Sequence, residues 1–215
     1  MSVITEPRPR YAEASRTLLR DSVLDAVGEL LAADAWTEVT MASVAERAGV
    51  SRQTLYNAFG NREALAQAYL MREAERFLTA IEDAVTSNVE DPRRALTSAA
   101  ELFLSLVSTH PMVRAISTQE GEELVALATT RGGALLTGMT DRLSELILAN
   151  WPAVDPAGAR LLAATLVRLA ISHAVLPTGE PEQTAADIAR ILGPYVDELL
   201  AVSYTHLTLP TNREV

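Results

Sequence analysis

The 215-residue sequence contains neither cysteine nor lysine, and it has few aromatic residues. The lack of cysteine excludes disulfides and thiol catalysis. No apolar run approaches the roughly 18 residues that span a bilayer, and the first ten residues lack the apolar core of a secretory signal. Because 48% of the residues are hydrophobic, the chain is globular. We therefore expect a cytoplasmic protein with no membrane partner.

All 18 basic residues are arginine, against 28 acidic residues and a net charge of −10. The planar guanidinium suits bidentate contacts to phosphate and guanine. Residues 1–63 hold 7 arginines and 9 acids (7 − 9 = −2), and residues 64–215 hold 11 and 19 (11 − 19 = −8). From Arg47 to Arg62 there are three arginines and no acid. A positive surface is therefore expected only there, since the rest of the chain repels a polyanion.

Strand-like alternation is also missing, and the apolar periodicity predicts an all-α fold. The first four helices are expected over residues 14–34, 41–48, 51–59 and 61–87. Thr40 and Ser51 are the expected N-caps of the second and third helices. Gly49 is expected to end the second helix in a left-handed conformation.

The rest of the chain carries equally clear helix-start signals, because Asp-Pro pairs occur at 91–92 and 155–156. The further helices are expected over residues 92–109, 111–117, 120–150, 155–176 and 182–202, with a weak point at Gly132–Gly133 and a kink at Gly193–Pro194. Residues 203–215 lack a helical period, so we interpret them as a non-native or disordered tail. A frayed native terminus is the alternative.

Residues 41–59 form two short helices joined by a tight glycine turn, which is a helix-turn-helix. At about 100° per residue, Leu55 and Phe59 face one side of the second of these helices. The opposite, polar face is formed by Arg52, Gln53, Tyr56 and Asn57, with Thr54 at its border. Arginine can bind guanine in a bidentate manner, and glutamine and asparagine can do so with adenine. An ordinary solvated face is the alternative, but such a face favours acids and this one has none.

Residues 15–65, and above all "TMASVAERAGVSRQTLYNAFGNREAL", resemble the DNA-binding domain of the TetR family of bacterial transcriptional regulators. The resemblance implies an all-α homodimer of about nine helices. It would have a three-helix helix-turn-helix DNA-binding domain (residues 1–63) and a C-terminal ligand-binding and dimerisation domain (residues 64–202).

The residues predicted to bind DNA are Thr40, Ser51, Arg52, Gln53, Thr54, Tyr56, Asn57 and Arg62. By position in the family motif, residues 52–54 resemble base contacts, whereas Thr40 and Arg62 resemble phosphate contacts. Ala35 stands where the family commonly has glycine. Arg8 and Arg10 lie in an arm that either enters the minor groove or makes no contact.

The C-terminal region gives weaker signals, and the resemblance there implies only a cavity between helices. The predicted ligand-binding residues are Phe77, Phe103, Val107, His110, Met112, Gln119, Met139, Leu143, Arg168 and His173, with Glu120 and Trp151 as further candidates. Core packing is the alternative for the apolar members. Because only 5% of the chain is aromatic, an aliphatic pocket for an apolar molecule is favoured. Spacing does not support a metal site from His110 and His173 with Glu120 or Glu123, and we expect no metal or cofactor.

The last two helices carry apolar stripes that two copies could bury as a four-helix bundle. The predicted dimer surface is Leu162, Leu166 and Leu169 with Ile188, Ile191, Leu192, Tyr195, Leu199 and Leu200, while Leu161, Ala164, Ile171 and Val175 are expected to face inward.

We therefore predict a ligand-responsive DNA-binding transcriptional regulator. It would be a repressor released from a palindromic operator by a small apolar inducer. The alternative is an all-α small-molecule-binding protein whose helix-turn-helix is non-functional. An enzyme is not expected, because no Ser-His-Asp set, glycine-rich phosphate loop or metal-ligand spacing is visible.

Overall fold

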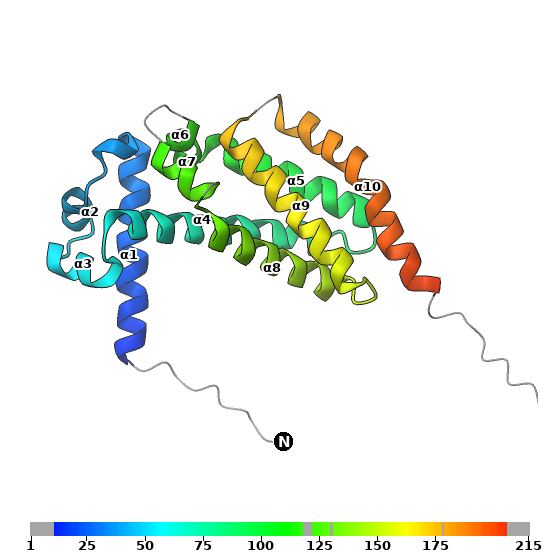
Figure 1. Ribbon diagram of the computed structural model, residues 1–215, viewed down its shortest axis with the longest axis horizontal. Helices are drawn as coiled ribbons and strands as arrows, with labels where there is room; N and C mark the ends of the chain where they lie inside the picture. Colours follow the sequence, from blue (N-terminus) through cyan, green and yellow to red (C-terminus); the bar gives the residue numbers. More distant parts are fainter. Residues whose placement is uncertain (1–10, 118–121, 130, 178, 206–215) are drawn as a thin grey trace, which may run out of the picture. The chain divides into compact units, whose positions relative to one another are not determined.

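The computed structural model describes residues 11–117, 122–129, 131–177 and 179–205 (Figure 1). Within these ranges it contains ten α-helices, one short 3₁₀ helix and no strand, which confirms the predicted all-α fold. The chain divides into two compact units, Met1–Tyr69 and Leu70–Val215. The division falls inside the continuous helix α4 (Arg62–Thr86), one and a half turns beyond the domain boundary expected from the sequence.

The first unit contains α1 (Tyr11–Ala33), η1 (Trp36–Glu38), α2 (Met41–Arg47), α3 (Arg52–Phe59) and the first residues of α4. Its core is made by side chains that are almost fully buried: Val23, Val27, Trp36, Val39, Val44, Leu55, Leu65 and Tyr69. Burial of an aliphatic side chain of this kind contributes about 1.5–3 kcal/mol each. This core fixes α3 against α1 and α2.

Local side-chain chemistry sets the ends of these short helices, as the sequence predicts. The Thr40 hydroxyl accepts a hydrogen bond from the Ser43 backbone N–H at 3.1 Å, and the Ser43 hydroxyl accepts one from the Thr40 N–H at 2.9 Å. Ser51 Oγ accepts from the Thr54 N–H at 3.0 Å. Gly49 has φ +67°, a conformation that L residues with side chains rarely adopt. Two caps and one glycine thus orient α3.

The second unit contains α5 (Pro92–Thr109), α6 (Pro111–Ser117), α7 (Glu122–Ala128), α8 (Gly133–Asn150), α9 (Pro156–Val175) and α10 (Pro181–Thr205). The predicted helix over 120–150 is two helices, because α7 ends before Gly132, which is the N-cap of α8. Helix α10 continues through Pro194 without the expected interruption and includes residues 203–205 of the predicted tail. Residues 206–215 lie outside the described residues.

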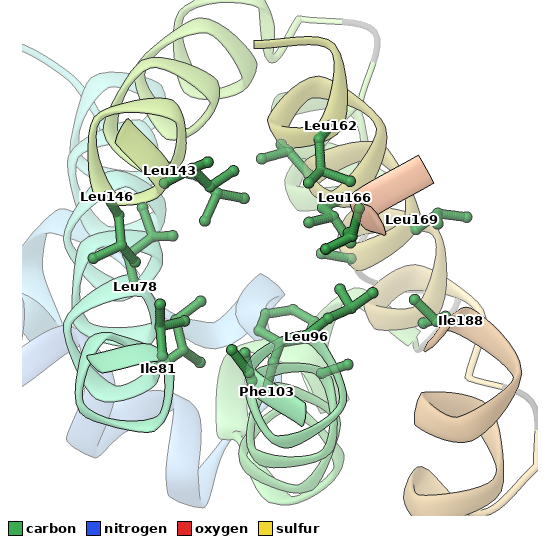
Figure 2. A pocket seen from close by; sticks show the side chains of 18 of the residues that line it. Leu78, Ile81, Leu96, Phe103, Leu143, Leu146, Leu162, Leu166, Leu169 and Ile188 are labelled. Atoms are coloured by element: carbon green, nitrogen blue, oxygen red, sulfur yellow. The ribbon is translucent and has the colours of Figure 1, made fainter. Parts of the chain in front are cut away.

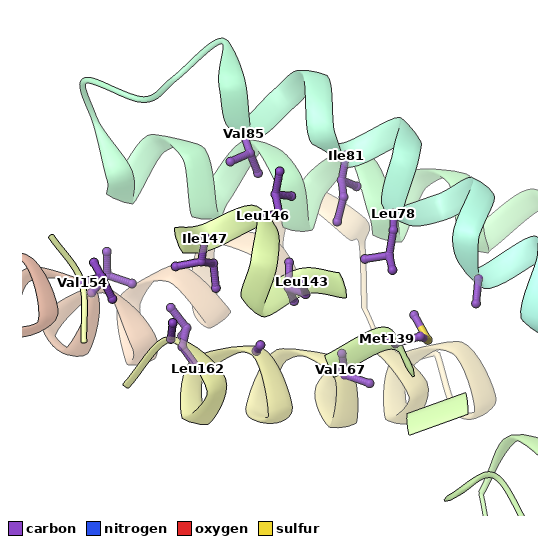
Figure 3. Close-up of a cluster of buried hydrophobic side chains, with 14 of the residues drawn as sticks. Leu78, Ile81, Val85, Met139, Leu143, Leu146, Ile147, Val154, Leu162 and Val167 are labelled. Atoms are coloured by element: carbon purple, nitrogen blue, oxygen red, sulfur yellow. The ribbon is translucent and has the colours of Figure 1, made fainter. Parts of the chain in front are cut away.

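The core of the second unit lies between α4, α8 and α9 (Figure 3). Leu78, Ile81 and Val85 of α4 meet the leucine and isoleucine side chains of α8, with Leu162 and Val167 of α9 beyond them. Helix α8 packs along α9, and α5 packs along α10. These five helices therefore build one apolar interior.

The predicted facing of α9 is confirmed for Ile171, which packs on the core, and is wrong for Leu161, Leu162 and Leu166. Leu162 is buried and Leu166 is half-buried against the core, whereas Leu161, expected to face inward, is 59% exposed. On α10, Leu199 and Leu200 also pack on the core, while Ile191 is 72% exposed. Helix α9 is apolar on two faces, so periodicity alone does not select the inner one.

The same two-faced composition makes α9 unusual among the described helices. By length and composition it alone could cross a membrane, a test that the core helix of a soluble protein also passes. No uninterrupted apolar stretch reaches this length, because Arg160 and Arg168 lie within Pro156–Val175. The expected cytoplasmic location stays a prediction.

Candidate nucleic-acid interface and ligand cavity

The polar face of α3 points to solvent. Arg52, Gln53 and Asn57 are exposed, and Tyr56 is 47% exposed. Leu55 and Phe59 are buried on the opposite side, as the helical spacing predicts. The exposed face therefore presents guanidinium, amide and phenol groups without a carboxylate, which is the set that can read base edges and bind phosphates.

Two amides on this face are already paired. Gln53 Nε2 donates a hydrogen bond to Asn57 Oδ1 at 2.9 Å, one helical turn apart. A primary amide has two N–H donors and a carbonyl acceptor, so this bond uses one donor of Gln53 and the oxygen of Asn57. The amide NH₂ of Asn57 and the carbonyl oxygen of Gln53 keep hydrogen-bonding capacity, which together match the N7 acceptor and N6 donor of adenine.

Arg20, which the sequence patterns do not indicate, stabilises the C-terminal end of α3. Arg20 of α1 donates from Nη1 to the Ala58 carbonyl at 3.0 Å, and its guanidinium carbon lies 4.5 Å from the Phe59 ring centroid. The contact spans 38 positions along the chain, so no local pattern indicates it. Arg20 thus stabilises the C-terminal end of α3 through a hydrogen bond and a cation–π contact.

Arg62, predicted to contact phosphate, is bound within the first unit. Its Nε donates to the Val39 carbonyl at 2.9 Å, its Nη2 donates to the Trp36 carbonyl at 2.6 Å, and its guanidinium carbon lies 4.2 Å from the Trp36 ring centroid. The guanidinium is partly buried in these contacts. Arg62 therefore fastens the start of α4 to the turn around Trp36.

The turn before Trp36 does not need the glycine that the family commonly has. Ala35 adopts φ −69° and ψ 154°, an extended conformation open to any residue. Thr40 and Ser51 are exposed at the N-termini of α2 and α3, but their hydroxyls act as caps. Arg8 and Arg10 lie outside the described residues.

A cavity of about 130 Å³ lies inside the second unit, between α4, α5, α8, α9 and α10 (Figure 2). The residues labelled in Figure 2 are Leu78, Ile81, Leu96, Phe103, Leu143, Leu146, Leu162, Leu166, Leu169 and Ile188. An engineered apolar cavity of roughly 150 Å³ stays dry and binds benzene. A cavity lined in this way can therefore hold hydrocarbon.

Half of the predicted ligand-binding residues line this cavity. The structure places Phe77, Phe103, Met139, Leu143 and His173 in its wall, together with the further candidate Trp151. Gln119 and Glu120 lie outside the described residues. The wall also contains many ordinary leucines, such as Leu146 and Leu166, that nothing in the sequence distinguishes from core residues.

Four predicted ligand residues, Val107, His110, Met112 and Arg168, are absent from the lining of this cavity. Val107 and Met112 are buried elsewhere, beyond the last turn of α5 that meets the cavity. Arg168 is exposed, so it is not a buried anchor for an anionic group. His110 is held by Glu73.

Glu73 is the centre of a buried ion cluster in the second unit. Its carboxylate is bound by Arg72 Nε at 3.0 Å, Arg76 Nη1 at 3.1 Å and His110 Nε2 at 3.2 Å, and the residue is only 4% exposed. Burial alone raises the pKa of Glu73. The hydrogen bond from His110 and the charges of the two arginines outweigh it, so the pKa lies below its ordinary value of 4.5.

The side chain of Phe77 connects the Glu73 cluster to the cavity. Phe77, which lines the cavity, makes an edge contact with the His110 ring at 5.1 Å and with Phe103 at 5.7 Å between centroids. His110 Nδ1 accepts from the Met112 N–H at 3.3 Å, so Nε2 is the nitrogen that donates to Glu73. In the part of the chain that the structure describes, no group of three or more His, Asp or Glu residues could hold a metal ion.

Comparison with known proteins gives consistent matches for both units. Residues 23–69 match the family model described as "Bacterial regulatory proteins, tetR family", and residues 91–194 match "Bacterial Tetracyclin repressor, C-terminal domain". The HTH-type transcriptional regulator AlkX of Mycobacterium tuberculosis is 36% identical over 188 residues, which cover 87% of this chain and 89% of the relative.

Solved structures agree. The TetR family repressor AlkX from a Dietzia species, described as implicated in biodegradation of n-alkanes, is 35% identical with a TM-score of 0.77. The match covers 84% of this chain and 96% of that one. A TetR-family regulator from Streptomyces coelicolor, 23% identical with a TM-score of 0.57, shares the fold over 85% of this chain and 99% of its own.

Proposed function

The chain belongs to the TetR family of DNA-binding transcriptional regulators, and we propose that it is a repressor released from a palindromic operator when an apolar molecule occupies its cavity. The observation that carries the proposal is the pairing of two surfaces of opposite chemistry. The first unit exposes an acid-free polar face on α3, and the second unit encloses a cavity walled by hydrocarbon.

The DNA-contacting set that we propose consists of Arg52, Gln53, Thr54, Tyr56 and Asn57, with Thr40 and Ser51 at the helix ends. Support comes from their exposure and from the Gln53–Asn57 amide pair, which arranges a donor and an acceptor side by side. Arg62 is left out of the set because its guanidinium is bound to backbone carbonyls.

A homodimer would cover the exposed apolar side chains of α9 and α10 and would supply two α3 helices. Leu161 on α9 and Ile191 on α10 are 59% and 72% exposed, and a second copy packed on these helices would cover them. Two copies would also carry two α3 helices to two half-sites about 34 Å apart in successive major grooves. This corrected dimer surface replaces the one built on Leu162 and Leu166.

Helix α4 is the proposed link between ligand and DNA. It begins at Arg62, which is bound to the Trp36 turn of the first unit, and it continues to Phe77, Leu78 and Ile81 in the cavity wall. A ligand that alters the packing of those side chains would bias the position of the same helix. By linkage, the ligand must weaken DNA binding by the factor by which DNA weakens ligand binding.

Our proposal for the regulated genes rests on what is described of a relative. The AlkX repressor of Dietzia is described as implicated in biodegradation of n-alkanes. The leucine-rich wall of this cavity suits unbranched hydrocarbon of that class. We infer that this chain regulates genes for the conversion of such molecules.

A band-shift assay on the intergenic DNA next to the gene tests the proposal. Wild-type protein is expected to bind with submicromolar affinity that falls steeply with salt. Arg52→Ala should weaken binding by about 10- to 100-fold, the value of one bidentate base contact. The matched control is Arg94→Ala, which removes an exposed arginine of α5. Equal binding by all three proteins would overturn the base contact of Arg52. Absence of binding by the wild-type protein would instead favour a small-molecule-binding protein with a non-functional helix-turn-helix.

A further inference from the structure

His173 is the exception in an otherwise hydrocarbon cavity wall. Among the lining residues, all in the described part of the chain, only Trp151 and His173 carry a side-chain nitrogen. Trp151 Nε1 donates to the Val89 carbonyl at 3.0 Å and is thereby satisfied. The half-buried imidazole of His173 has no hydrogen-bond partner among the described residues. The cavity therefore offers one polar group with unused capacity.

This group lies at one end of an apolar stripe. Leu162, Leu166, Leu169 and His173 follow one another at spacings of four, three and four residues, which keeps them on one face of α9. At 1.5 Å per residue the stripe is about 16 Å long. Figure 2 shows the three leucines along the same wall, with Ile188 of α10 near Leu169. The wall is thus long, apolar along its length and polar at its end.

We propose that His173 binds the terminal hydroxyl of an unbranched primary alcohol whose hydrocarbon tail lies along the Leu162–Leu169 stripe. This inference rests on the proposed role of the cavity as the ligand site. A neutral imidazole has one donor and one acceptor nitrogen, and a hydroxyl is also both donor and acceptor. A bare alkane would cover the imidazole and leave it unsatisfied, which costs free energy.

The charge pattern distinguishes the alcohol from a carboxylate. No arginine lines the cavity, and Arg168 lies five residues before His173, about 140° around the helix, where it is exposed. A carboxylate brought into this wall would lose water without gaining a permanent cation, and that desolvation is costly. An uncharged oxygen avoids this cost.

The ligand class also gives the protein a place in a reaction sequence. A primary alcohol is the product of hydroxylation at the terminal carbon of an unbranched alkane. Terminal hydroxylation by an oxygenase is one reaction class that supplies such a ligand. The protein would then bind the product of hydrocarbon oxidation at least tenfold more tightly than the hydrocarbon itself.

Calorimetric titration of the full chain with 1-decanol, decane and decanoate tests the proposal. We expect wild-type protein to bind 1-decanol at least tenfold more tightly than decane or decanoate. His173→Phe should remove about tenfold of the alcohol affinity, the value of one hydrogen bond, and leave decane binding unchanged. His173→Gln, which keeps a donor and an acceptor, should restore part of it. Arg168→Ala is the matched control and should change nothing.

The outcomes separate this inference from the proposed function. If decane and 1-decanol bind wild-type protein equally, or decanoate binds most tightly, the alcohol assignment is overturned while the cavity remains a ligand site. If none of the three binds, the ligand role of the cavity fails and the inference fails with it. The wild-type comparison needs no variant, so a misfolded His173→Phe protein leaves the test intact.

Discussion

The two compact units differ in where their candidate functional side chains lie. In the first unit they lie on an exposed helix face, and in the second they line the interior. In the first unit, α3 buries Leu55 and Phe59 and turns Arg52 and Asn57 outward, so specificity lies in exposed polar groups. In the second unit, five helices turn aliphatic side chains inward around a cavity, and the ligand specificity that we propose lies in its shape and in one imidazole. A reading surface must be wet and polar, whereas a hydrocarbon site must exclude water. Substitutions in each unit test this difference.

The largest effect is expected in the second unit, at the Glu73 cluster. Glu73→Ala leaves the buried side chain of Arg72 and the ring of His110 without their carboxylate, and breaking a buried ion cluster costs about 3 kcal/mol or more. The free energy of unfolding in urea should fall by this amount. Glu101→Ala, an exposed acid on α5, is the control and should change it little. Similar values for both variants would show that the cluster contributes no stability.

A smaller effect is expected from Arg62→Ala in the first unit. The variant loses two hydrogen bonds to backbone carbonyls and the contact with the Trp36 ring, so the free energy of unfolding should fall by about 2 kcal/mol. The salt dependence of DNA binding should stay unchanged, since no phosphate contact is removed. A drop of about 0.9 in the logarithmic salt slope, with stability intact, would restore the phosphate role.

The pH dependence of stability tests the Glu73 cluster of the second unit. The pKa of Glu73 is lowered in the folded protein, so its stabilisation is complete above the ordinary pKa of 4.5 and is lost as pH falls through the folded value. The destabilisation caused by Glu73→Gln should therefore be larger at neutral pH than well below pH 4.5. Urea titrations at the two pH values measure this difference. A constant difference would mean that Glu73 is not ionised in its cluster.

The smallest effect is expected at an exposed ion pair between α5 and α10. Arg93 Nε donates to both carboxylate oxygens of Asp197, at 2.9 and 3.0 Å, on the outside of the second unit. Solvent-exposed pairs of this kind contribute little because water and salt screen them. Arg93→Ala should leave the unfolding midpoint and ligand affinity unchanged. A clear loss of ligand affinity would show that the α5–α10 contact controls the cavity.

The first unit could be predicted largely from the sequence because its determinants are local. Thr40 and Ser51 each cap the helix that follows by accepting from a backbone N–H three residues on, and Gly49 is needed where the chain takes a positive φ. The polar face of α3 follows from spacing alone. The exceptions, Arg20 and Arg62, act across 38 and 23 to 26 positions, where sequence patterns carry no information.

The second unit resisted prediction because its residues have more than one plausible environment. Leu161 and Leu162 are neighbours of the same type, yet only the fold decides that Leu162 faces the cavity. His110 and His173 looked alike in the sequence, but Glu73 binds one and the cavity wall contains the other. Apolar periodicity predicts that a helix face is buried, but it does not predict whether that face packs on the core or lines a cavity.

Linked titration of DNA and ligand tests the central claim most directly. The anisotropy of a labelled fragment of the neighbouring intergenic DNA would be measured against protein concentration, with and without saturating 1-decanol. We expect submicromolar binding without ligand and an affinity at least tenfold lower with it, since DNA and ligand are coupled reciprocally. DNA binding whose affinity is the same with saturating, bound 1-decanol would contradict the account.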